Sequence, residues 1–126
     1  MLDNFIEQPL AVVKGDTIRY NFLVDNIGED EEFDEIAFTI KANAEDETPV
    51  VSSTMTNGKI QRVGYDAEKH RATYYVEGAS SETENLTPNT FAYYDIRGIF
   101  DDAVVTMLRG RVKVLLDITE FGGNEE

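Results

Sequence analysis

The chain has 126 residues, of which 41% are apolar and 29% are charged. This composition is typical of one globular domain, and the length allows a sizeable core without disulfides or metals. Eleven basic residues against 25 acidic ones give a formal charge of −14. The acidic balance excludes a generic nucleic-acid binder, which needs clustered Lys and Arg, and it argues against docking on anionic lipid.

Missing residue types exclude several kinds of site. The chain has no cysteine, so disulfides, thiolate catalysis and cysteine-bound metals are ruled out. The single histidine, His70, cannot belong to a site built from several histidines. No apolar run approaches the ~20 residues of a membrane helix, and residues 1–8 lack the basic region of a signal peptide.

Alternation of apolar and polar residues with a period of two dominates the chain and predicts β-strands. Residues 9–13 are expected to form a short edge strand, because Pro9 fits only at an edge or a strand start. After a turn at residues 14–16, the segment 16–25 has an apolar face of Ile18, Tyr20, Phe22 and Val24.

The middle of the chain predicts three more strands. Residues 35–42 alternate, with Ile36, Phe38 and Ile40 pointing inward. Weaker strands are expected at 50–55 and 59–64. Asn57-Gly58 between them suits a primed turn, so this is the best hairpin signal in the chain.

The C-terminal half contains the strongest pattern. Residues 71–77 form a strand with Ala72, Tyr74 and Val76 on one face, and the small, polar residues 78–84 form a loop. An aromatic strand follows at 91–97, and residues 98–103 form a turn around Asp101-Asp102.

The longest predicted strand covers residues 104–119. Gly110 inside it indicates a bulge or bend. Its length suggests an exposed end that is available for strand addition, and residues 120–126 are expected to form a polar tail. One face carries Val112, Val114, Leu116 and Ile118.

Seven or eight short strands without a convincing helix predict an antiparallel, immunoglobulin-like β-sandwich. A small antiparallel barrel is the alternative. Nothing marks a domain boundary, so residues 1–126 are expected to form a single domain.

No pattern predicts a catalytic, cofactor-binding or metal-binding residue, so we expect no enzyme activity and no cofactor. The acidic clusters at 29–35 and 45–47 lack the spacing of an EF-hand and favour solvated loops over calcium sites. A glycosidase needs two carboxylates at a fixed separation, but among 25 acids such a pair arises by chance. The chain also has no Trp to form the usual platform for a sugar. His70 belongs to a polar connection without a nucleophile motif, and Asn85-Leu86-Thr87 matches a glycosylation acceptor by chance.

Two tyrosine pairs, Tyr74-Tyr75 and Tyr93-Tyr94, occur on different predicted strands. One member of each pair must face outward in a regular strand. Tyr75 and Tyr93 are therefore candidate interface residues, because tyrosine is an amphipathic anchor. Packing against cross-strand neighbours on a solvated face is the alternative.

An ordered set of short motifs in residues 86–119 resembles a known family. The set consists of Leu86-Thr-Pro88, then Phe91-Ala-Tyr93-Tyr94-Asp95-Ile96, then Val105-Thr106-Met-Leu108-Arg-Gly110-Arg-Val112-Lys-Val114, and finally Asp117-Ile118-Thr119. With the opening Val13-Lys-Gly15-Asp16-Thr17, it resembles the N-terminal domain of phage upper-baseplate proteins and of small tail-associated proteins of phages and prophages.

The resemblance implies an immunoglobulin-like sandwich that attaches a receptor-binding element to a tail or baseplate, without catalytic residues to carry over. Upper-baseplate proteins usually continue into a linker or coiled coil, whereas this chain stops at Glu126. A stand-alone adaptor, tail-completion or decoration protein is therefore expected.

The expected function is that of a structural protein of a phage or prophage virion, made in the cytoplasm of the bacterial host. It would be a non-catalytic adaptor or accessory subunit of the tail, baseplate or capsid surface. The expected partners are other virion proteins and further copies of the chain, with no nucleic acid and no membrane. A carbohydrate-binding module is the alternative, which the missing Trp disfavours, and a small hydrolase or metal-dependent enzyme is least favoured.

Overall fold

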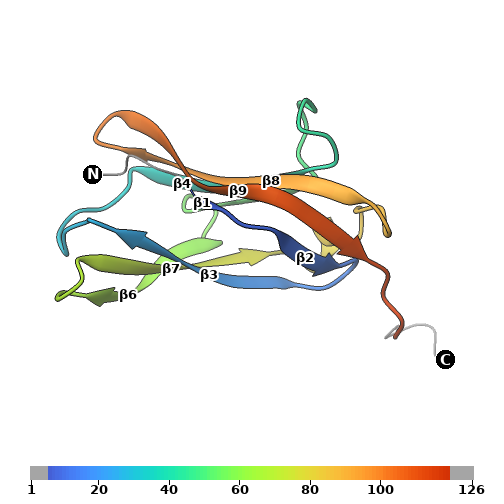
Figure 1. Ribbon diagram of the computed structural model, residues 1–126, viewed down its shortest axis with the longest axis horizontal. Coiled ribbons are helices and arrows are strands. Elements are labelled where there is room, and N and C mark those ends of the chain that lie inside the picture. The colour runs from blue at the N-terminus through green and yellow to red at the C-terminus, as the bar shows by residue number, and fades with distance from the viewer. Residues whose placement is uncertain (1–5, 120–126) are drawn as a thin grey trace.

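The computed structural model describes residues 6–119, and within them nine strands build two sheets that pack face to face (Figure 1). The larger sheet has the order β1 (Ile6–Glu7), β9 (Ala103–Leu115), β8 (Phe91–Phe100), β4 (Glu35–Lys41) and β5 (Val51–Thr54), and β2 (Leu10–Val13) also pairs with β9. The smaller sheet has the order β3 (Ile18–Asp25), β7 (Arg71–Gly78) and β6 (Ile60–Asp66).

The path of the chain between the sheets is that of an immunoglobulin-like sandwich. It leaves the smaller sheet after β3, builds β4 and β5 of the larger sheet, and returns for β6 and β7. It then crosses back through the helical turn α1 (Ser80–Thr83) to the β8–β9 hairpin. The predicted fold class is confirmed. The barrel alternative is wrong, because within the described residues no ladder joins the two sheets.

The core consists of the side chains that alternate inward on the two sheets, as the period of two predicts. Phe38 and Ile96 of the larger sheet are fully buried, as is Tyr74 of the smaller sheet. The Tyr74 ring stacks on Phe22 at 5.5 Å between centroids and meets the edge of Phe33 at 5.9 Å. These rings fill the space between the sheets, and their burial is the main stabilising term.

The predicted hairpin around Asn57-Gly58 is wrong at the level of pairing. The turn itself closes, since the Lys59 amide donates to the Thr54 carbonyl at 3.1 Å. However, β5 pairs with β4 and β6 pairs with β7, so the turn carries the chain from one sheet to the other. Each of the two strands pairs with a strand at least as long as itself, and that pairing replaces the local one.

The strand predicted at 104–119 ends earlier, at Leu115. Leu116 and Ile118 are exposed, Ile118 by 95%, so their predicted inward placement is wrong. The physical reason is the loss of partners: the amides of Lys14 and Asn89 make the last bonds to β9, and both neighbouring segments then turn away. Between Leu108 and Leu115, β9 is an interior strand, so this stretch does not offer the expected free end for strand addition.

Three smaller differences concern local geometry. The segment 78–84 contains one helical turn, because the buried Thr83 hydroxyl donates to the Asp16 carbonyl at 2.7 Å and holds the crossover in place. The turn after β8 is only Asp101-Asp102, both with positive φ as a two-residue primed turn requires. The edge strands β1 and β2 run parallel to β9, so the larger sheet is mixed rather than antiparallel.

The irregularity of β9 lies at Met107, where the register against β8 shifts between Ile96 and Arg97. The bulge predicted at Gly110 is therefore misplaced. Gly110 instead allows a close approach of the chain, because a Cβ atom there would lie 2.3 Å from the Gln8 carbonyl oxygen. In the described part of the chain, no helix is long and apolar enough to cross a membrane.

We predict that Gly110→Ala lowers the free energy of unfolding by about 1–3 kcal/mol, because the link between β1 and β2 must move away from β9. Gly64→Ala is the matched control, since its nearest atom would lie 3.8 Å away. Urea unfolding of both variants tests this. Equal stability of the two would contradict the close approach.

Candidate interaction surface

The two candidate tyrosines lie on opposite sides of the sandwich. Tyr75 is half-buried on the outer face of the smaller sheet, where its hydroxyl donates to Glu77. Tyr93 is 40% exposed on β8, on the outer face of the larger sheet. Their neighbours Tyr74 and Tyr94 are buried, so one member of each pair does face outward. Tyr75 and Tyr93 cannot, however, belong to one contact surface.

The outer face of the larger sheet collects positive charge in this acidic protein. Five of the eleven basic residues lie on it, and we call this surface the basic face. Paired residues of neighbouring strands point to the same side of a sheet, which places these side chains together. The basic face is formed by Lys41 of β4, Arg97 of β8, and Arg109, Arg111 and Lys113 of β9.

The register of the strands arranges the basic face in rows. Lys41, Tyr93 and Arg111 form one row across β4, β8 and β9. The next row contains Asp95 beside Arg109. Because the strands fix the backbone, the spacing of these side chains along the surface is set by the fold.

Exposed aromatic and apolar side chains accompany the charges. The Arg111 guanidinium lies 4.7 Å from the centroid of the Phe91 ring, a cation–π contact that orients both groups. Ile99 and Val104 form an exposed apolar pair at the far end of β8 and β9. Arginine, aromatic and apolar groups on one surface are typical of protein interfaces.

A shallow hollow of about 270 Å³ lies on the basic face. Its floor is polar, with Thr39 and Asp95 on neighbouring strands. Lys41, Arg97 and Arg109 surround it, together with Tyr93 and Ala44.

Within the described strands of the larger sheet, three acidic side chains point to the side of the basic face, and Asp95 is the central one of them. Glu7 pairs with Arg109 at the edge, and Glu35 accepts hydrogen bonds from Met55 and Thr56. Burial raises the pKa of Asp95 above its ordinary value, although the nearby arginines and Lys41 act in the opposite direction. The carboxylate is thus held in a less favourable setting than in the unfolded chain.

We predict that Asp95→Asn raises the free energy of unfolding at about pH 7. The pKa of Asp95 is higher in the folded chain than in the unfolded one, so ionisation destabilises the fold at neutral pH. The gain should vanish as the pH falls through the folded pKa, towards about pH 3. Urea unfolding at both pH values, with Asp30→Asn as an exposed control, measures the effect; a gain independent of pH would contradict it.

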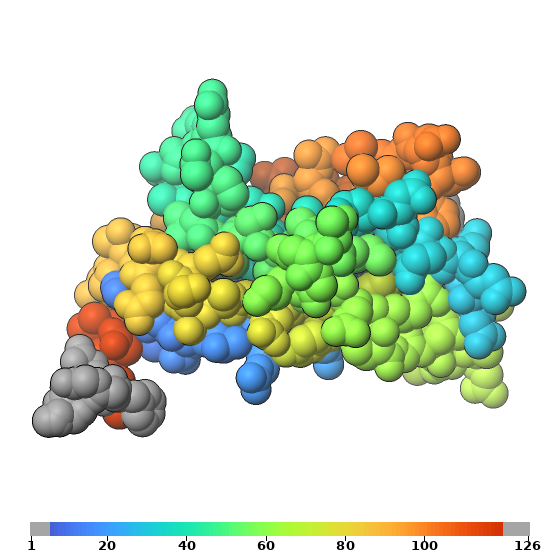
Figure 2. All heavy atoms as spheres, turned by 180° about the vertical axis from the view of Figure 1, so that it is seen from behind, coloured from blue at the N-terminus to red at the C-terminus, as the bar shows by residue number. Residues whose placement is uncertain are grey.

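The acidic residues of the first predicted cluster gather at one end of the sandwich. The loop 26–34 and the β8–β9 turn lie together there, as Figures 1 and 2 show. They surround an open hollow of about 410 Å³. We call this group the acidic end: Glu31, Glu32, Asp34, Asp101 and Asp102.

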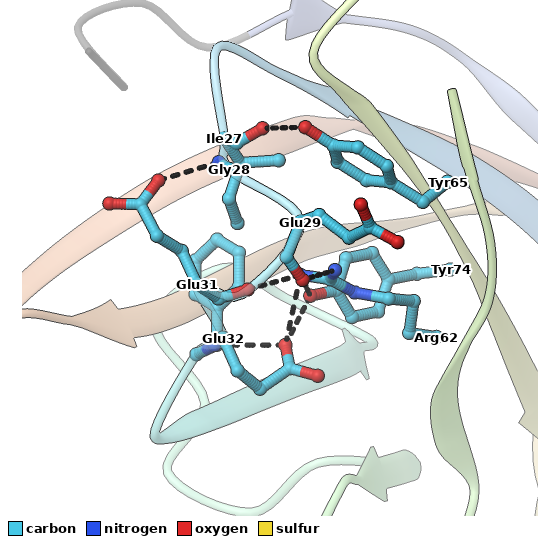
Figure 3. A network of polar contacts seen from close by, with 9 residues as sticks. Ile27, Gly28, Glu29, Glu31, Glu32, Arg62, Tyr65 and Tyr74 are labelled. Carbon is cyan, nitrogen blue, oxygen red and sulfur yellow. Dashed lines mark hydrogen bonds and ion pairs between the residues drawn. The ribbon is translucent and has the colours of Figure 1, made fainter. Parts of the chain in front are cut away.

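Arg62 of β6 holds the loop 26–34 against the body of the protein (Figure 3). Its guanidinium donates to the carbonyls of Glu29, at 3.0 Å, and Glu31. It also donates to the Tyr74 hydroxyl, which in turn donates to the Glu32 carboxylate. The loop that sequence reasoning treats as merely solvated is thus fixed by a fork of donors that only arginine can supply.

Two further contacts complete the network of Figure 3. The Tyr65 hydroxyl donates to the Ile27 carbonyl at 2.7 Å, and the Glu31 carboxylate accepts from the Gly28 amide at 2.6 Å. Burial, followed by the hydrogen bond to Glu32, raises the pKa of Tyr74 to about 12. The Tyr74 hydroxyl therefore stays a donor throughout the neutral range.

We predict that Arg62→Lys lowers the free energy of unfolding by about 1–2 kcal/mol, because lysine keeps the charge but loses the fork. Amides of residues 28–32 should exchange with solvent faster, while those of β7 stay protected. Arg19→Lys is the control, since Arg19 is exposed on the outer face of β3. Unchanged exchange in the loop would show that Arg62 does not hold it.

The remaining motifs lie at the surface. His70 is exposed in the turn between β6 and β7, with a positive φ of 52°. Asn85 and Thr87 are exposed after α1. Glu45 and Glu47 are exposed between β4 and β5, where Asp46 accepts from the Asn43 amide. Among the residues that the structure describes, no three acidic or histidine side chains are placed to hold a metal ion.

Sequence reasoning missed the basic face, although the signal was present. The alternation that places Val112 and Val114 inward also places Arg111 and Lys113 outward. What the pattern could not reveal is which strands lie beside β9. Only the order β9-β8-β4 brings Arg97 and Lys41 onto the same surface.

The chain matches known proteins in structure but not in sequence. No family model matches the chain, and no curated protein is similar enough in sequence to match it. Among solved structures, the extracellular domain of the voltage-gated sodium channel beta4 subunit aligns over 94% of this chain and 98% of its own. The identity is 9% and the TM-score 0.38, and that domain forms parallel homodimers that explain its role in cell–cell adhesion. At this similarity nothing about the function of that protein transfers to this chain.

Proposed function

We propose that this protein is a non-catalytic structural protein of a phage or prophage virion, made in the cytoplasm of the bacterial host. It acts as an adaptor or accessory subunit of the tail, baseplate or capsid surface through protein–protein contacts. The observation that carries the proposal is the basic face, a platform of three strands that displays cations and rings in an otherwise acidic molecule.

The chemistry of the basic face favours a protein partner. Arginine and tyrosine are enriched at the centre of protein interfaces, and Tyr93 lies in the row between Lys41 and Arg111. The exposed Ile99 and Val104 add apolar area at one end. The expected partner surface is acidic at its centre and apolar at one margin.

The resemblance to phage tail-associated domains supports a virion as the setting. It is densest at residues 86–119, which include β8 and β9. The motifs that resemble the family therefore lie on the strands that carry Tyr93, Arg97 and Arg111. Of the motif residues, Phe91, Tyr93 and Asp95 point to the same side of the sheet as the cations, whereas the cations themselves lie between or beyond the motif residues.

The test uses purified particles of the phage or prophage that encodes the chain. Quantitative mass spectrometry should find the wild-type protein at a fixed copy number per particle. Arg97→Glu with Arg111→Glu should reduce incorporation by at least about tenfold, because two cations of the basic face become anions. The matched control, Arg19→Glu with Lys69→Glu, changes the net charge equally on other surfaces and should be incorporated normally.

Absence of the protein from purified particles would overturn the virion role. A glycan-array signal that Tyr93→Ala abolishes would instead favour the carbohydrate-binding alternative, since Tyr93 borders a polar hollow with Asp95. Normal incorporation of the variant with Arg97→Glu and Arg111→Glu would show that the contacts in the particle use another surface.

A further inference from the structure

The connection between β4 and β5 projects from the larger sheet on the side of the basic face. In Figures 1 and 2 this segment, residues 42–50, rises away from the sandwich on the side opposite to the smaller sheet. Ala44 of this segment borders the hollow on the basic face, so the projection begins at the margin of that surface. We call the segment the acidic loop, since it carries Glu45, Asp46 and Glu47.

The acidic loop has a defined shape and free charges. The Asn43 amide donates to the Asp46 carboxylate at 3.0 Å, and the Asp46 amide donates to the Asn43 carbonyl at 3.0 Å. These two bonds close a turn over residues 43–46, and Glu45 within the turn and Glu47 directly after it are exposed. A closed turn loses little conformational entropy when its tip meets a partner.

One side of the molecule therefore carries two complementary surfaces, a basic floor and an acidic projection beside it. A surface with both halves of a contact matches a second copy of itself after rotation about a twofold axis, which is the condition for a closed, isologous dimer. In such a pair each acidic loop lies over the basic face of the other copy. The cations of the face, among them Arg97 and Arg111 on either side of the row of Asp95 and Arg109, then face the loop of the other copy.

The proposed function makes the basic face a protein contact, and on that basis we propose that the partner bound there is a second copy of this chain. The two chains form a face-to-face dimer in which the acidic loop of each one binds the basic face of the other. The large negative charge of each copy opposes association at long range. At about 0.15 M salt this repulsion is screened beyond ~8 Å, whereas the contacts between Glu45 or Glu47 and the cations remain.

The dimer also covers groups that the isolated chain exposes. Tyr93 and Phe91 lie on the floor of the contact, and their burial adds apolar area to the charge pairs. Arg97 and Lys41 lie near Asp95, so an incoming carboxylate meets cations at the centre of the face. The acidic end with Asp101 and Asp102 lies beyond the other end of the sheet and stays outside the proposed contact.

The test is a charge exchange read by light scattering after size-exclusion chromatography and by sedimentation. The loop variant carries Glu45→Lys and Glu47→Lys, and the face variant carries Arg97→Glu and Arg111→Glu. The wild type should have twice the chain mass of 14.2 kDa. Each variant alone should associate at least about tenfold more weakly, because like charges then face each other.

Mixing the two variants is the decisive step. Every contact in a mixed pair joins opposite charges, so the mixture should form a one-to-one heterodimer that stops at two chains. One chain with all four substitutions should dimerise with itself again. The pair Arg19→Glu and Lys69→Glu is the control and should leave the wild-type dimer intact, while circular dichroism verifies that every variant is folded.

The proposal is overturned if the wild type remains a monomer up to about 1 mM. It is equally overturned if the loop and face variants dimerise as the wild type does, or if mixing them restores nothing. These outcomes are separable from the virion role. If the protein is a monomer that enters particles only with an intact basic face, the proposed function stands and the partner is an acidic virion protein. If the protein dimerises but is absent from particles, only the dimer proposal stands.

Discussion

The packing of the two sheets through one layer of apolar side chains determines which residues lie on the outer surfaces of the molecule. Tyr74 of the smaller sheet stacks on Phe22 and meets Phe33, and fully buried Phe38 and Ile96 face them from the larger sheet. Because side chains alternate along a strand, fixing one face inward fixes the other outward. The outer face of β4, β8 and β9 is therefore a consequence of the core. A slip of one residue in register would exchange the basic face with the interior.

Arg62 extends this order to a loop that has little reason to be ordered by itself. The segment from Glu29 to Glu32 carries four consecutive acids, whose mutual repulsion favours an extended, solvated chain. Arg62 donates to backbone carbonyls within the segment, and Ile27 and Phe33 anchor its two ends in the core. One partly buried cation thus gives the acidic end a fixed surface, and the negative charge becomes a feature with a definite position.

The sequence was informative wherever a property depends on neighbours along the chain. Alternation predicted the strands and the inward sets, such as Ile36, Phe38 and Ile40, and the tyrosine pairs correctly indicated one outward member each. Prediction from the sequence failed where a feature depends on which strands become neighbours in a sheet. The turn at Gly58 carries the chain between sheets instead of forming a hairpin, and Leu116 loses its partners although its pattern continues. The basic face belongs to this second class, because it combines residues of three strands.

The distribution of cations requires a physical reason. Scattering eleven basic residues among 25 acidic ones would lower the repulsion in this chain most effectively, yet five of them gather on one face. There Asp95, whose pKa is raised by burial, lies at the centre of the group. Carboxylates that reach the face from outside meet opposite charges there. The acidic loop beside the face presents carboxylates on the same side of the molecule, where only another copy can use them in a reciprocal contact.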